Sequence, residues 1–123
     1  MTENYRRFEV GPDPFGRNWI VEFRWLQTGI SIRHADTVDV KFQLMCGEDA
    51  QEKVIALPHP DLLALSKEME RPLTDPWCMK IAALHLRHMI ETDEDMEKTL
   101  VTVSLDDMRR HADVLNRPVP VRR

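Results

Sequence analysis

The feature that most constrains the fold is a strict alternation of apolar and polar residues that ends at Cys46. In residues 35–46, ADTVDVKFQLMC, the apolar positions are every second residue, Val38, Val40, Phe42, Leu44 and Cys46. Successive side chains of an extended strand point to opposite faces of its sheet. A period of two therefore predicts a strand with one buried and one solvated face, and the chain must supply both partner strands and a cover.

Similar patterns predict further strands in the first half of the chain. They lie at residues 5–10, 18–27, 30–34 and 53–58. Gly29 marks either a turn or a bulge within one long bent strand. Residues 11–16 hold two prolines and two of the four glycines, and they predict a turn. Residues 47–52 predict a loop.

The alternation also assigns side chains to the two faces of the sheet. The large apolar residues at the odd positions of the second strand predict a buried row, Trp19, Val21, Phe23 and Trp25. The intervening positions and their partners predict a solvated face with Glu22, Arg24, Arg33, Asp39, Lys41 and Gln43.

The second half of the chain is predicted to be mostly helical. One helix is expected from Pro60 to about Arg71, and a second from the pair Asp75-Pro76 to about Glu91. Residues 98–103 predict a strand. Ser104 then caps a third helix, whose apolar stripe is Leu105, Met108, Ala112 and Leu115.

This order predicts the α+β class, with an antiparallel four- to five-stranded meander sheet and two or three helices packed on one face. We expect one domain over residues 1–116. Residues 117–123, RPVPVRR, are expected to be an extended tail.

Composition narrows the functional classes. The chain has 123 residues, 42% of them hydrophobic, which is enough for one domain with a core. Its net charge of −4 weighs against a dedicated nucleic-acid binder.

The two cysteines, Cys46 and Cys78, are too few for a disulfide framework and are expected to be reduced thiols. Without a signal peptide or an apolar span, we expect a soluble cytoplasmic protein with no membrane partner.

Sequence motifs of catalysis are missing. The chain has no glycine-rich phosphate loop, no GxSxG elbow and no HExxH pair. Asp93, Asp95 and Glu97 resemble an EF-hand, but Lys98 stands where that loop requires glycine. We therefore expect no cofactor and lean against an enzyme, although distant residues can still assemble into a site.

His85 and His88 are candidate metal ligands because they lie three residues apart on one predicted helix. At 100° per residue, both project onto the side that also carries Trp77 and Ile81. This projection favours neutral histidines buried in the core over a metal or acid–base site. It also predicts that the histidines are separated from the carboxylates that follow them.

The acidic run after the histidines, Asp93, Glu94 and Asp95, is interpreted as a solvated turn. Carboxylates are unfavourable at a helix C-terminus but favourable in a first turn. We expect Thr92 to cap such a turn.

Three functions remain open from sequence. The leading hypothesis is a non-catalytic binding or accessory module that forms a homo-oligomer, since an open sheet has edges to cover. The second is a metal-binding protein or metal-dependent enzyme that uses His85 and His88. The third is an anion or nucleotide binder on the solvated sheet face, through Arg24, Arg33 and Lys41.

Overall fold

The computed structural model describes residues 5–29 and 36–116. The elements follow in the order β1 (Arg7–Val10), β2 (Trp19–Gly29), β3 (Thr37–Cys46), β4 (Asp49–Pro58), α1 (His59–Glu68), α2 (Asp75–Thr92), β5 (Leu100–Thr102) and α3 (Leu105–Asn116). The predicted α+β class is confirmed. Arg33, the predicted strand at 30–34 and the predicted tail at 117–123 lie outside the described residues.

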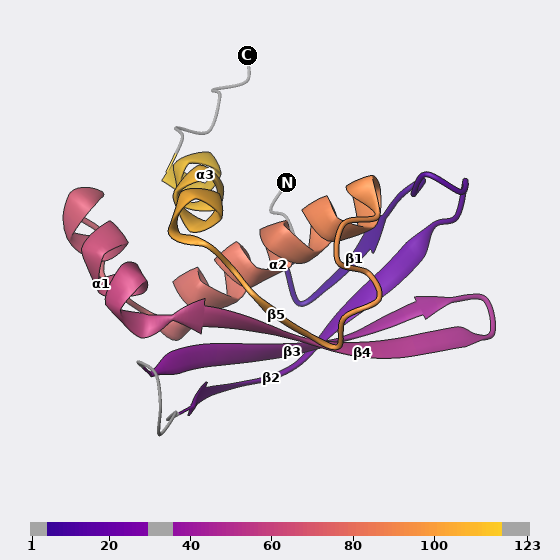
Figure 1. Cartoon of the computed structure of the whole chain (residues 1–123), viewed down its shortest axis with the longest axis horizontal. Coiled ribbons are helices and arrows are strands. Elements are labelled where there is room, and N and C mark those ends of the chain that lie inside the picture. Colours follow the sequence, from indigo (N-terminus) through magenta and orange to yellow (C-terminus); the bar gives the residue numbers. More distant parts are fainter. Residues whose placement is uncertain (1–4, 30–35, 117–123) are drawn as a thin grey trace, which may run out of the picture.

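The five strands lie in one sheet, in chain order from β1 to β5. The first four pair antiparallel, as the predicted meander requires, whereas β5 runs parallel to β4. A parallel neighbour needs a crossover connection, which α1 and α2 provide. Figure 1 shows all three helices on one side of the sheet. In the described residues, no helix is both long and apolar enough to cross a membrane.

The connection between β3 and β4 is much shorter than the predicted loop at 47–52. Cys46 pairs with Asp49, so only Gly47 and Glu48 form the turn. Gly47 has a φ of +59°, a conformation that glycine adopts without steric cost. Residues 49–52 belong to the predicted loop, and all four are exposed. They nevertheless pair with β3.

A bulge in β2 reverses the alternation that the sequence predicts. Phe23 pairs with Phe42 and Trp25 pairs with Lys41, so Arg24 is an extra residue in its strand. Phe42 belongs to the buried face and Lys41 to the opposite one. The prediction that Trp25 lies beneath the helices is therefore wrong, and Trp25 stands on the outer face.

The core lies between the sheet and the helix layer. Strands β3 and β4 supply fully buried side chains, Phe42, Leu44, Ile55 and Leu57, and the helices supply Leu62, Leu65, Ile81, Leu86 and Met89. Helix α2 contacts β1, β3, β4 and α3. It is the central element of the layer.

The helix ends follow local rules. Thr74, one residue earlier than predicted, is the N-cap of α2 and accepts a hydrogen bond from the Trp77 backbone N–H. Ser104 accepts from the backbone N–H of Asp107 at 3.2 Å, so the predicted cap of α3 is confirmed. Helix α1 ends at Glu68, earlier than the predicted Arg71.

Asp13 organises the loop between β1 and β2. Its carboxylate accepts hydrogen bonds from the backbone N–H groups of Phe15 and Arg17, from Arg17 Nε and from Trp19 Nε1. Burial alone would raise the pKa of this carboxyl group. The hydrogen bonds outweigh that effect and lower its pKa to about 2.

The bulge predicts that the two tryptophans of β2 contribute unequally to the stability of the fold. Trp19 is 1% exposed and Trp25 is 37% exposed. We expect Trp19→Ala to lower the free energy of unfolding by about 3–5 kcal/mol, because it empties a core position. Trp25→Ala should cost less than about 1 kcal/mol. Urea unfolding at low protein concentration measures both, and equal losses would contradict the reversed alternation.

Candidate functional site

His85 of α2 and His111 of α3 form a buried pair. His85 Nδ1 lies 3.1 Å from His111 Nε2, and their rings meet edge to face. One ring nitrogen donates its hydrogen to the lone pair of the other, so at least the accepting ring is neutral. Burial, together with the neighbouring His85 and Arg110, lowers the pKa of His111 to about 4. Burial also lowers the pKa of His85. His85 lies in the core, as expected.

His88 does not follow this expectation. Its side chain is 32% exposed, and its Nε2 lies 3.0 Å from Oε2 of Glu94. The predicted separation of histidines from carboxylates is therefore wrong at this residue. A helical projection orders residues within the helix only, and Glu94 lies beyond its end.

The chain reversal at the end of α2 brings Glu94 to His88. Asp93, the C-cap, has a left-handed φ of +59°. Thr92 is the last helical residue; its Oγ1 donates to the His88 carbonyl at 2.7 Å and accepts from the Glu94 backbone N–H at 3.3 Å. The expected role of Thr92 in the turn is confirmed, although it also belongs to the helix.

Within the described residues, the histidines belong to no cluster that could hold a metal ion. In residues 5–29 and 36–116, no group of three or more His, Cys, Asp or Glu side chains is arranged to hold a metal ion. His85 Nδ1 is already occupied by His111. The three pockets described below have no histidine in their walls. The metal hypothesis for His85 and His88 gains no support from these contacts.

A buried lysine anchors the acidic turn to the sheet. Lys53 of β4 is 2% exposed, and its Nζ donates to the carbonyls of Met96 at 2.7 Å and Lys98 at 2.6 Å. Burial lowers the pKa of this ammonium group, and Glu97 opposes the shift. Sequence reasoning missed this lysine, although it pairs with Phe42, whose side chain is on the buried face.

The structure brings Arg24 and Lys41 together on the outer sheet face. They line a pocket of about 280 Å³ with Phe23, Trp25 and Glu52. Lys41 Nζ lies 3.3 Å from Glu52, and Arg24 lies 3.8 Å from Glu22. Both cations thus have a carboxylate neighbour on this face. Glu52 was missed as a partner because residues 47–52 were expected to form a loop.

The outer face also carries a row of side chains across four strands. The pairings Trp25–Lys41, Lys41–Val54 and Val54–Leu100 place them in line. Trp25 is 37% and Leu100 59% exposed, and Lys41 Nζ lies 5.7 Å from the centre of the indole ring.

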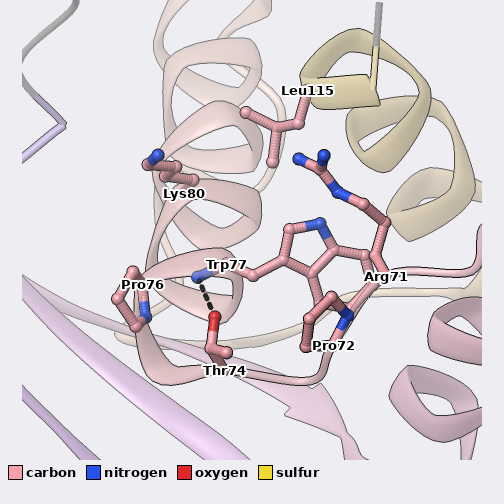
Figure 2. A pocket seen from close by; sticks show the side chains of 7 residues that line it. All are labelled: Arg71, Pro72, Thr74, Pro76, Trp77, Lys80 and Leu115. Atoms are coloured by element: carbon pink, nitrogen blue, oxygen red, sulfur yellow. Dashed lines mark hydrogen bonds between the residues drawn. The ribbon is translucent and has the colours of Figure 1, made fainter.

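Two more pockets lie by the start of α2. One, of about 350 Å³, is lined by Arg6, Phe23, Trp25, Leu26, Asp75, Pro76 and Met79. The other, of about 220 Å³, is shown in Figure 2 and is lined by Arg71, Pro72, Thr74, Pro76, Trp77, Lys80 and Leu115. We call the latter the α2 pocket. Its residues come from the stretch 71–80 and from Leu115 of α3, and sequence reasoning did not group them.

Cys78 offers no reactive thiolate. Both cysteines are free, as expected, and Cys78 is buried in α2. Burial and the nearby Asp75 raise the pKa of the Cys78 thiol to about 11. The thiol stays protonated near neutral pH and is a poor nucleophile.

The histidine pair predicts a stability loss in mild acid. The ordinary pKa is 6.5 and that of folded His111 is about 4, so the unfolded chain binds a proton that the folded chain does not. The free energy of unfolding should fall as the pH drops from 6.5 to 4, by about 1.4 kcal/mol per pH unit for this group. The double variant His85→Leu/His111→Leu should lose much of this slope.

Denaturant unfolding at several pH values measures the slope. His59→Gln, which removes a histidine from α1, is the control and should keep the wild-type slope. An unchanged slope in the double variant would show that other groups produce the pH dependence.

Comparisons with protein-family models, with curated proteins and with solved structures gave no match. The candidate sites therefore rest on the geometry of the chain's own side chains. These sites are the histidine pair, the outer sheet face and the α2 pocket.

Proposed function

We propose that this chain is a non-catalytic binding module that self-associates through the outer face of its sheet. The observation that carries the proposal is the row of Trp25, Lys41, Val54 and Leu100 across that face. The helices cover the opposite face, and no described element covers this one. Exposed apolar residues that lie together commonly mark an interaction surface.

Apolar area continues along the same face. Ile20, which is 36% exposed, pairs with Met45, and Met45 pairs with Ala50. This second row lies toward the hairpin end of β3 and β4. Burying both rows against another sheet would remove their apolar surface from water. Packing of one sheet on another at about 10 Å is a common arrangement.

The charges on this face favour a second copy as the partner. The face carries cations, Arg24 and Lys41, beside carboxylates, Glu22 and Glu52. A two-fold contact presents the same patch on both subunits. Because both signs are present, a second copy can place its cations opposite these carboxylates without net repulsion. Internal pairing of the cations makes the anion-binding alternative on this face less favourable.

The sheet also has open edges. The outer strands are short, with four residues in β1 and three in β5. They pair only with Trp19–Glu22 of β2 and Val54–Ala56 of β4, so the rest of these two strands offers backbone groups at the edges. We place the contact on the face because the exposed apolar rows lie there.

Sedimentation equilibrium tests the proposal. We expect a concentration-dependent dimer, and Leu100→Glu should shift it to monomer because it places a charge in the apolar row. Leu63→Glu is the matched control, since Leu63 is a 44% exposed leucine on α1, in the helix layer. This control should retain the dimer.

Two results would count against the proposal. One is a wild-type protein that stays monomeric up to about 1 mM, where even weak pairs associate. The other is a dimer that Leu63→Glu dissociates and Leu100→Glu does not, which would assign the contact to the helix layer.

A further inference from the structure

We propose that the α2 pocket is a binding site for a small organic anion, a carboxylate or phosphate group on a compact apolar body. This inference concerns the helix layer and is independent of self-association through the sheet. It rests on an indole N–H donor that opens into the pocket, on two cations that form no ion pair within the described residues, and on apolar walls.

The donor is the indole N–H of Trp77. The side chain as a whole is 6% exposed, but no buried side-chain nitrogen or oxygen among the described residues lacks a partner, so Nε1 itself is accessible from the pocket. Figure 2 shows this nitrogen on the ring edge that faces Leu115 and the Arg71 guanidinium. By contrast, Trp19 donates its indole hydrogen to Asp13. An indole N–H donates only, so a group that enters this pocket can accept its hydrogen.

Two cations line the same pocket. Arg71 and Lys80 are wall residues, and no wall residue is acidic. Within the described part of the chain, neither residue forms an ion pair; Lys80 Nζ instead lies 5.7 Å from the centre of the Tyr5 ring. The guanidinium fork matches a carboxylate or phosphate in two parallel hydrogen bonds. The pocket is therefore locally positive in a chain whose net charge is −4.

The backbone holds these groups in place. Glu70, two residues beyond the end of α1, has a left-handed φ of +53°, and the Arg71 backbone N–H donates to the Ser66 carbonyl at 3.0 Å. On the other side, Thr74 caps α2, whose first turn carries Trp77. The positive end of the α2 dipole thus points toward the pocket and adds to the attraction for an anion.

Shape and walls limit the ligand. A volume of about 220 Å³ fits a small molecule. Pro72, Pro76 and Leu115 supply apolar surface around the polar groups. The combination of apolar walls and convergent donors fits an aromatic or branched aliphatic acid.

NMR of the indole N–H groups tests the site with defined probes. The chain has three tryptophans, and Trp77→Phe assigns the Trp77 resonance. We expect benzoate or phenyl phosphate to shift that resonance, and benzyl alcohol, a neutral compound of similar shape, to leave it in place. Binding by only one of the two anions would narrow the ligand to that group.

Two variants locate the binding. Arg71→Gln should weaken the binding of the active anion about tenfold or more, because it removes a charge-assisted pair of hydrogen bonds. Arg24→Gln is the matched control on the outer sheet face and should bind as the wild type does. Circular dichroism verifies that both variants fold.

Several outcomes would overturn the proposal. They are no shift with either anion at about 10 mM, well above the range of specific weak binding, an equal shift with benzyl alcohol, or unchanged affinity in Arg71→Gln. Loss of binding in Arg24→Gln alone would place the anion on the sheet instead.

Discussion

The burial of α2 is the constraint on which the rest of the structure depends. This helix packs against the inner face of the sheet and against α3, and ten of its eighteen residues are buried. A helix enclosed to this extent must either be apolar around its circumference or satisfy its polar groups internally. Both solutions are present. Ile81, Leu86 and Met89 fill the core, and His85 bonds to His111.

The two ends of α2 extend beyond the core, so their surroundings differ from those of its buried middle. At its start, Trp77 is buried while Arg71 and Lys80 reach solvent, so donors converge around a small pocket. At its end, the left-handed Asp93 turns the chain back and Glu94 meets His88. Lys53 then fixes the following turn through two backbone carbonyls. The buried middle of the helix thus positions polar groups at both of its ends.

The two proposed surfaces lie on opposite sides of the sheet. The helix layer contains the α2 pocket, while the outer face carries exposed apolar side chains and paired charges. Self-association through the outer face would leave the pocket accessible. A module of this kind can bind a small ligand on one side and a second copy on the other, and each surface can be altered without changing the other.

The sequence by itself determined the class of fold and most of its elements. Alternation at 37–46 and helical spacing after Pro60 reflect which side chains can be buried, and burial is the main driving force for folding.

Only the tertiary structure decided which face of the sheet Trp25 occupies, that His88 contacts Glu94, and which residues line the α2 pocket. The physical reason is common to all three. A bulge depends on the register with a neighbouring strand, and a contact beyond a helix end depends on the path of the following turn. A pocket depends on segments that meet only after packing. Local periodicity contains none of this information, because each arrangement is selected by the fit between elements rather than by the residues of any one of them.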